Sequence, residues 1–272
     1  MEPLAKPIWG RPLRDPSLTR QEKPRSRGLT MVIDKGMGLS AFRDLLVLAA
    51  DYIDFIKLGF GTISLTPVPL LREKLRLSEA YHVHLYPGGT FFEVAYNQDG
   101  MNHYFETLFK IGFQWLEISD GTITLSPEQR SESIRAARDS SFRVITEIGK
   151  KQKGSITPVA ELVETYHQDR ENGAEFIIVE GRESGRDIGM FNEKGDVDTD
   201  YVLSVEKQLD PSRIWWECPQ LAQQITLLKL LGADTNLGNI PAHEVLSVES
   251  LRRGLRSDTF YTFGSPQEEA TL

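Results

Sequence analysis

Four glutamates stand near the ends of apolar runs and could together bind a divalent metal ion. They occur in the stretches "WLEIS", "VITEIG", "IIVEG" and "IWWEC", as Glu117, Glu147, Glu180 and Glu217. Four buried carboxylates cannot all remain ionised and unpaired, so cations must neutralise them or a metal ion must bind them. Oxygen ligands suit Mg²⁺, and we predict a Mg²⁺ site drawn from these four. The alternative is a ring of ion pairs that only closes the top of the fold.

Basic residues follow the same apolar runs and indicate a substrate with negative charge. They are Lys35, Lys57, Lys150, Lys151 and Arg182. An arginine offers a planar fork to a carboxylate or a phosphate, whereas a lysine offers a point charge. Two further turns could present backbone N–H groups to an anion. They are "PGGT", with Gly88 and Gly89, and "NLGNIP", with Asn236 and Asn239.

Eight short apolar segments must position these residues, and helical patterns lie between them. The segments cover residues 29–34, 52–59, 81–88, 113–119, 142–149, 176–181, 213–218 and 234–240. The expected helices cover 40–50, about 98–112, 126–140, 157–174, 220–233 and 241–255. Polar strand ends recur about every 30 residues, which is typical of βα units around a parallel sheet.

Eight such units predict an α/β fold, a (β/α)₈ TIM barrel that forms a single domain over residues 26–264. An open doubly wound sheet is the rival fold. It is disfavoured because no glycine-rich dinucleotide fingerprint follows the first strand. We expect residues 1–25 to form an irregular, proline-rich arm and residues 265–272 to form a short tail. Ile8 and Trp9 of the arm could dock on the barrel or on a neighbouring subunit.

The carboxyl ends of the strands in such a barrel meet at one mouth, where catalysis takes place. Side chains two residues apart on a strand share a face. Lys151 should therefore point into the mouth with Glu147, and Arg182 should do so with Glu180. Glu183 has the opposite parity and is expected to brace the loop.

Composition and charge exclude several classes of protein. The chain has 272 residues, a formal net charge of −8 and a single cysteine. We therefore expect no nucleic-acid partner and no disulfide framework. No apolar run approaches the roughly 20 residues of a membrane span, and no apolar signal core is evident at the N-terminus. We predict a cytoplasmic protein without a membrane partner. Barrels of this size often self-associate, so we also expect a homo-oligomer.

Several motifs together resemble the phosphosulfolactate synthase family. They run in order from about Gly28 to Phe260 and include "GLTMVIDKG", "DYIDFIKLGFGT", "YPGGTFFEVA", "EISDG", "TEIGKK", "EGRESG", "NLGNI" and "LRRGLRSDT". The resemblance implies a (β/α)₈ barrel that catalyses Mg²⁺-dependent addition of sulfite to phosphoenolpyruvate. The implied product is (2R)-2-phospho-3-sulfolactate, which enters coenzyme M synthesis in methanogens and sulfolactate production in some bacteria.

The resemblance also suggests roles for the residues of the mouth. Lys151 is expected to act as the general acid toward C2 of the substrate, with Lys150 and Lys57 as alternatives. Arg182, Lys57 and Arg256 are expected to hold phosphate, carboxylate or sulfite, while the four glutamates hold Mg²⁺ and orient the bases. Two other functions stay open. One is a non-catalytic barrel that acts through interactions, as in stress-associated relatives, and the other is a lyase that uses another nucleophile.

Overall fold

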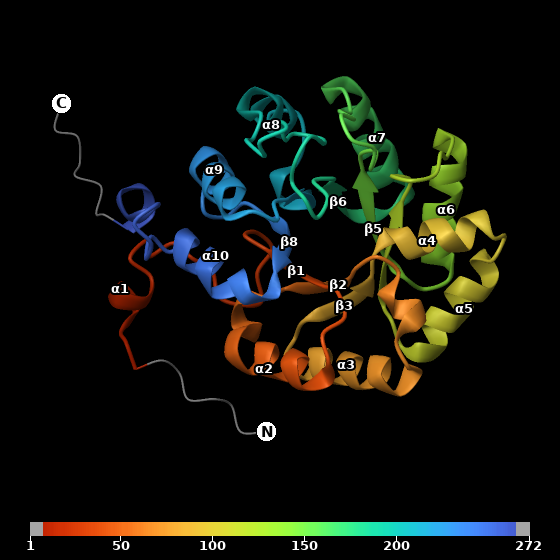
Figure 1. Cartoon of the computed structure of the whole chain (residues 1–272), viewed down its shortest axis with the longest axis horizontal. Helices are drawn as coiled ribbons and strands as arrows, with labels where there is room; N and C mark the ends of the chain where they lie inside the picture. Colours follow the sequence, from red (N-terminus) through yellow and green to blue (C-terminus); the bar gives the residue numbers. More distant parts are fainter. Residues whose placement is uncertain (1–7, 265–272) are drawn as a thin grey trace.

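Eight parallel strands form the barrel in the computed structural model, which describes residues 8–264 (Figure 1). The strands are β1 (Thr30–Asp34), β2 (Phe55–Leu58), β3 (His84–Pro87), β4 (Trp115–Ser119), β5 (Arg143–Ile148), β6 (Ala174–Val179), β7 (Ile214–Glu217) and β8 (Leu237–Pro241). Their hydrogen-bonded order is β3-β2-β1-β8-β7-β6-β5-β4. The ends of this order, β3 and β4, lie side by side without a ladder between them. The predicted TIM barrel is thus confirmed, as a nearly closed one.

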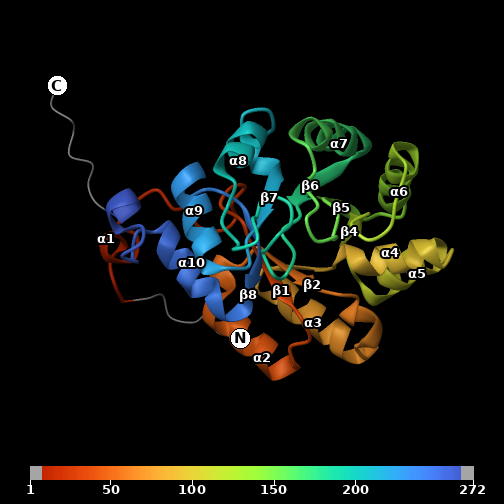
Figure 2. The same cartoon turned by 45° about the horizontal axis from the view of Figure 1, so that its top comes forward.

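Helices follow the strands and cover the outside of the barrel (Figure 2). They are α2 (Leu39–Ala49), α3 (Val68–Ala80), α4 (Gly89–Asn97), α5 (Met101–Ile111), α6 (Pro127–Asp139), α7 (Val159–Asn172), α8 (Thr199–Glu206), α9 (Leu221–Leu231) and α10 (Val245–Arg252). Short 3₁₀ turns cover Ala50–Tyr52, Thr62–Leu65, Pro211–Arg213 and Ala242–Glu244, and one π-turn covers Phe260–Gly264.

Local sequence signals explain where some of these helices start and stop. Ser126 caps α6 by accepting a hydrogen bond from the Gln129 N–H, and the Gln129 side chain accepts from the Ser126 N–H in return. Helices α5 and α7 end at Gly112 and Gly173, both in the left-handed conformation that glycine tolerates. The sequence prediction lacked α3, α4 and α8. Helix α4 begins inside the "PGGT" turn, where glycine masks the helical signal.

The inside of the barrel changes character from one end to the other. Below the mouth, interior side chains from the beginnings and middles of the strands form an apolar cluster of Leu29, Met31, Phe55, Tyr86, Trp115, Ile145, Ile178 and Trp215. Near the carboxyl ends the interior side chains are charged, and they form the mouth described below. A second, larger core separates the strands from the helices.

The N-terminal arm crosses the outside of the barrel and is held by two buried ion pairs. The Arg20 guanidinium lies 3.1 Å from Glu249 of α10, and that of Arg25 lies 2.9 Å from Asp54 before β2. Its short helix α1 (Arg11–Arg14) buries no side chain. Ile8 and Trp9 are 89% and 60% exposed, so neither docks on the barrel. Residues 1–7 of the arm and the tail predicted over 265–272 lie outside the described residues.

No helix between residues 8 and 264 combines the length and the apolar character that crossing a membrane would require.

Candidate active site

A buried lysine occupies the centre of the barrel near the mouth. Strand β2 carries Lys57, whose Nζ lies 3.1 Å from Glu117 Oε2, 3.1 Å from Glu147 Oε2 and 2.9 Å from Glu217 Oε1. These glutamates come from β4, β5 and β7, so the lysine joins strands on different sides of the barrel. Burial opposes its charge, but the three carboxylates outweigh this effect and raise the Lys57 pKa well above its ordinary value. Lys57 is therefore a fixed ammonium ion.

A second lysine shares Glu147 with the first and reaches toward solvent. Lys151 Nζ lies 3.0 Å from Glu147 Oε1 and 3.4 Å from Glu93 Oε1, and its side chain is 21% exposed. Burial would lower its pKa, but Glu147 and Glu180 raise it above the ordinary lysine value. Glu147 would itself be harder to ionise because of burial, yet Lys151 and Lys57 hold its pKa well below the usual range. The predicted shared direction of Lys151 and Glu147 agrees with these contacts.

Three carboxylates come close enough to bind one ion together. Oxygens of Glu147, Glu180 and Glu217 all lie within 4.8 Å of one another. Glu180 Oε2 is buried and has no hydrogen-bond partner among residues 8–264, although Lys151 Nζ lies 4.0 Å from it. Burial, Glu147 and Glu217 raise the Glu180 pKa well above its ordinary value. Without a further cation, this environment favours the neutral form of Glu180 over the ionised form.

Glu117 is the fourth predicted metal ligand, and it has a different environment. Burial raises its pKa to about 7, although Lys57 acts in the opposite direction. Its Oε1 accepts a hydrogen bond of 2.7 Å from the Gly89 N–H. Within the part of the chain that the structure describes, the three-carboxylate cluster does not include it. Glu117 thus neutralises Lys57 and accepts a hydrogen bond from the first residue of α4.

The backbone N–H groups of the "PGGT" turn already donate to other parts of the protein, which corrects the expectation that they bind an anion. Besides the Gly89 contact with Glu117, the Gly88 N–H donates to the Leu58 carbonyl at 3.0 Å. A Cβ on Gly89 would lie 2.4 Å from Ser119 Cβ, so no larger residue fits there. These two N–H groups are therefore not free to bind an anionic substrate.

The two asparagines of "NLGNI" lie at opposite ends of β8. Asn236 precedes the strand, where its Oδ1 accepts from the Leu29 N–H at 2.9 Å and its Nδ2 donates to the Ile214 carbonyl at 3.1 Å. Its position at the amino-terminal end contradicts the prediction that it contacts substrate at the mouth. Its contacts instead tie β8 to the neighbouring strands.

Asn239 sits on a β-bulge close to the mouth. Thr30 and Val32 of β1 pair with Leu237 and Ile240, so β8 has one extra residue over this stretch. Asn239 has a left-handed backbone with φ of 55°, and its buried Oδ1 has no hydrogen-bond partner in the described part of the chain. Bulges beside active sites often redirect a side chain. Asn239 thus remains a candidate for substrate contact.

Two of the other predicted cations support loops and do not face the glutamates. Lys150 Nζ donates to Asp120 Oδ2 at 2.7 Å and to the Ile123 carbonyl at 3.1 Å. Arg256 follows α10, where it contacts Asp258 at 3.1 Å and Ser247 Oγ at 2.7 Å. Neither side chain contacts a residue of the mouth, so the placement expected for Arg256 is not met.

The remaining two cations are exposed near the mouth. Lys35 pairs with Glu183, which agrees with the bracing role expected for that glutamate. Arg182 has a left-handed backbone with φ of 55°, so strand alternation no longer sets its direction. Its N–H donates to Glu180 Oε1 at 2.5 Å, while its side chain is exposed. Both stay predicted substrate-binding residues.

Sequence reasoning missed one buried acid of the site and two buried cations that hold the ends of strands. Glu93 of α4 is 3% exposed, and its Oε1 accepts a 2.7 Å hydrogen bond from Ser119 Oγ. A charge inside the apolar stretch "FFEVA" was the available signal. Lys74 of α3 lies 2.6 Å from Asp34, and Arg130 of α6 donates to the carbonyl of Glu147 at 3.1 Å. Both fix the ends of site-bearing strands.

Eight parallel strands with buried acids and bases at their carboxyl ends define a (β/α)₈ barrel of the kind that carries an active site. Over residues 18–258 the chain matches the sequence model of the (2R)-phospho-3-sulfolactate synthase (ComA) family. The chain belongs to this family, which confirms the resemblance drawn from its motifs.

Named relatives support this assignment along most of the chain. The phosphosulfolactate synthase of Methanothermobacter thermautotrophicus is 40% identical over 242 residues, 88% of this chain and 94% of that protein. Its counterpart in Bacillus subtilis is 36% identical over 245 residues, 89% of this chain and 96% of that protein. The crystal structure of 3-hexulose-6-phosphate synthase from Salmonella typhimurium matches with a TM-score of 0.54 at 17% identity, covering 82% of this chain and 97% of that one. The structural likeness shows the fold alone.

Proposed function

We propose that the protein is a lyase that adds sulfite to phosphoenolpyruvate in a Mg²⁺-dependent reaction, giving (2R)-2-phospho-3-sulfolactate. The observation that carries this proposal is the placement of Lys151. It is a part-exposed ammonium 3.0 Å from Glu147, beside a three-carboxylate cluster at the barrel mouth. The names of the relatives point to the same reaction. Both substrates are small anions of the cytoplasm, where we place the reaction.

The reaction requires a proton donor but no protein nucleophile. The sulfite sulfur uses its lone pair to bond to C3 of phosphoenolpyruvate, and the electrons of the C2–C3 double bond move toward the carboxylate. The resulting aci-carboxylate then takes a proton at C2 while the phosphate stays in place. Lys151 is the group we assign to donate this proton, from the one face of the substrate that would give a single configuration.

The site residues also fit a divalent ion. Four strand-end glutamates face two lysines, so full ionisation would leave an excess of at least two negative charges. Mg²⁺ prefers such oxygen ligands, and Glu180 Oε2, which accepts no hydrogen bond from the described residues, is available to it. We therefore assign the ion to Glu147, Glu180 and Glu217. When bound, it would supply positive charge beside the developing aci-carboxylate.

The remaining polar groups at the mouth would hold the substrates. Arg182 and Lys35 are exposed cations, and each could bind a phosphate or carboxylate group. The unpartnered amide oxygen of Asn239 can accept a hydrogen bond from a bound water. Arg182 and Lys35 place positive charge at the outer edge of the mouth, and a bound Mg²⁺ would offset the excess of carboxylates inside it, so that the two anions could bind there.

A direct assay tests this proposal with neighbouring lysines as a matched pair. Purified protein is mixed with phosphoenolpyruvate, sulfite and Mg²⁺, and the product is detected by ³¹P NMR. Lys151→Ala should lower kcat by at least about 100-fold, because general acid catalysis typically contributes 10²–10⁴-fold. Lys150→Ala should cost less than about tenfold, because Lys150 only holds the loop after β4. If both variants lose kcat to the same extent, Lys151 is not the proton donor.

The same assay separates the two alternative functions. A panel of other nucleophiles, including thiosulfate and cyanide, would reveal a lyase that does not prefer sulfite. Absence of turnover with sulfite and with every nucleophile of the panel would support the non-catalytic barrel and overturn the proposal. Sedimentation of the same preparation tests the homo-oligomer that we propose as the active form.

A further inference from the structure

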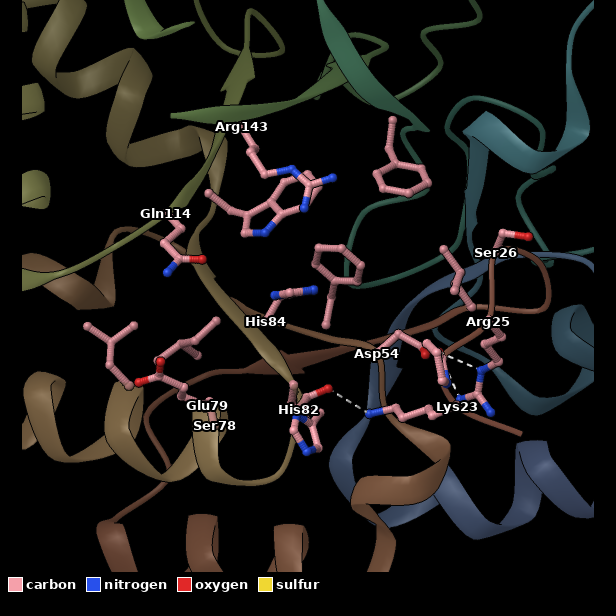
Figure 3. Close-up of a pocket in the computed structure, with 18 of the residues that line it drawn as sticks. Lys23, Arg25, Ser26, Asp54, Ser78, Glu79, His82, His84, Gln114 and Arg143 are labelled. Atoms are coloured by element: carbon pink, nitrogen blue, oxygen red, sulfur yellow. Dashed lines mark hydrogen bonds and ion pairs between the residues drawn. The ribbon is translucent and has the colours of Figure 1, made fainter. Parts of the chain in front are cut away.

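A large hollow opens at the amino-terminal end of the barrel, opposite the mouth (Figure 3). Its volume is about 870 Å³, within the range of small-molecule sites. Four residues that line it, Phe55, His84, Trp115 and Arg143, are the first residues of β2, β3, β4 and β5. The active-site residues lie at the other ends of these strands, so the hollow is a separate space.

The floor of the hollow is aromatic. The Phe55 ring meets the Trp115 ring edge to face, with centroids 5.0 Å apart, and it meets the Trp215 ring in the same way at 4.8 Å. Phe176 lies 5.2 Å from Trp215 and also lines the hollow. Such a floor offers faces and edges on which a flat ring can stack.

The rim of the hollow carries positive charge although the protein as a whole is acidic. Figure 3 shows Lys23, Arg25 and Arg143 around it. The Arg143 guanidinium lies over the Trp115 ring at 4.0 Å, and that of Arg213 lies over Phe176 at 5.7 Å. A guanidinium held over a ring is oriented to present its N–H groups to an anion.

Two of these cations are not committed to a carboxylate. Arg25 is paired with Asp54, and Arg143 is paired with Glu175. Across residues 8–264, by contrast, Arg213 has no carboxylate at ion-pair distance, and Lys23 Nζ donates only to the His82 carbonyl at 3.0 Å. Burial lowers the Lys23 pKa to about 8, which indicates an ammonium group short of compensating charge.

Two buried polar atoms of the lining also lack partners. Ser78 Oγ and Trp115 Nε1 belong to residues only 1% and 2% exposed, and neither has a hydrogen-bond partner within residues 8–264. Buried polar atoms are nearly always satisfied in folded proteins, so an exception calls for a missing water or ligand. Both residues line the hollow.

We propose that this hollow is a second binding site, specific for a small aromatic anion: a planar ring that carries a sulfonate, carboxylate or phosphate group. The ring packs against the accessible edges of Phe55, Trp115 and Phe176, beside the Arg143 guanidinium that covers Trp115, while the anionic group binds Arg213 and Lys23. Phosphoenolpyruvate and sulfite have no ring to fill such a floor. The site is therefore distinct from the mouth, and the proposal does not depend on the reaction catalysed there.

Titration calorimetry with naphthalene-1-sulfonate as the probe tests the proposal without any catalytic readout. We expect saturable binding that saturating phosphoenolpyruvate does not displace. Sodium sulfate, which lacks the ring, and 1-naphthalenemethanol, which lacks the charge, should each bind at least tenfold more weakly. Quenching of tryptophan fluorescence by the probe should follow the same isotherm, because Trp115 lies in the floor.

Two variants identify the cations, and a third provides a control. Arg213→Gln and Lys23→Gln, on different elements of the rim, should each weaken the probe at least tenfold. Arg76→Gln should bind as the wild type does, because Arg76 projects from the exposed side of α3 and pairs with Glu73. Circular dichroism shows whether each variant is folded. Failure of the probe to bind, equal affinity for the neutral ring, or wild-type affinity in both rim variants would overturn the proposal.

Discussion

Removing the central lysine should cost stability in a way that depends strongly on pH. In Lys57→Met, the carboxylates of Glu117, Glu147 and Glu217 would lose the ammonium group that lies 2.9–3.1 Å from each of them. These residues are at most 2% exposed, so water cannot replace the lost partner. The least costly response is for one more carboxyl group to take a proton in the folded state.

The size of this cost follows from the ordinary pKa of a glutamate. The ordinary value is 4.5. Each pKa unit is worth about 1.4 kcal/mol, so holding one carboxyl protonated costs about 5 kcal/mol at about pH 8 and about 1.4 kcal/mol at about pH 5.5. The higher figure agrees with the ~3–5 kcal/mol typical of breaking a buried pair. A carboxyl whose folded pKa is raised takes up a proton on folding, so the stability of the variant falls as pH rises.

Urea denaturation of wild type and variant at both pH values measures this difference. Lys74→Met is the matched control, since Lys74 is similarly buried and its one ion pair with the described residues is with Asp34, at 2.6 Å. The Asp34 carboxylate also accepts the N–H groups of Gly36 and Met37, so its charge stays solvated without the lysine. We expect the control to show a smaller cost that changes little with pH. A cost for Lys57→Met that is the same at both pH values would refute the reasoning.

Three further outcomes follow from contacts described above. Gly89→Ala should destabilise the fold by ~1–3 kcal/mol in thermal melts, because its Cβ would lie 2.4 Å from Ser119 Cβ; an unchanged Tm would contradict this. Burial would raise the Glu249 pKa, but Arg20 lowers it below the ordinary 4.5. The wild type should therefore have a higher free energy of unfolding than Glu249→Gln at neutral pH, and this difference should shrink as pH falls below 4.5. Glu93→Gln should lower kcat while leaving the urea midpoint nearly unchanged, and a wild-type kcat would remove Glu93 from the site.

The barrel itself could be predicted because its signal repeats along the whole chain. Each apolar run ends in a polar residue, and the eightfold repeat outweighs errors at single elements. Helices α4 and α8 were missed because glycine or a long irregular segment obscures their beginnings. The gap between β3 and β4 has no local signal, since it depends on how distant strands meet.

Strand alternation located the part of the site that lies on regular strands. Glu147 and Lys151 meet as expected, although β5 ends at Ile148 and Gly149 between them has a φ of 134°, so alternation alone does not explain their contact. The rule failed where the backbone turns left-handed, as at Arg182 and Asn239. The prediction placed Asn236 at the carboxyl end of its strand, but β8 starts at Leu237, so Asn236 lies at the opposite end of the barrel. The buried Glu93 comes from a helix, where a strand-based rule cannot find it.

The unpaired edges of β3 and β4 have a consequence for how the protein can be observed. Backbone amides that face this gap lack the ladder bonds that protect the rest of the sheet. They should exchange with deuterium earlier than those of β1 or β8, whose two edges are both paired. Lys57 on β2 and Glu117 on β4 bridge the same gap by charge. The rate of deuterium uptake along β3 and β4 should therefore change when a ligand bound at the mouth alters the ion pair between Lys57 and Glu117.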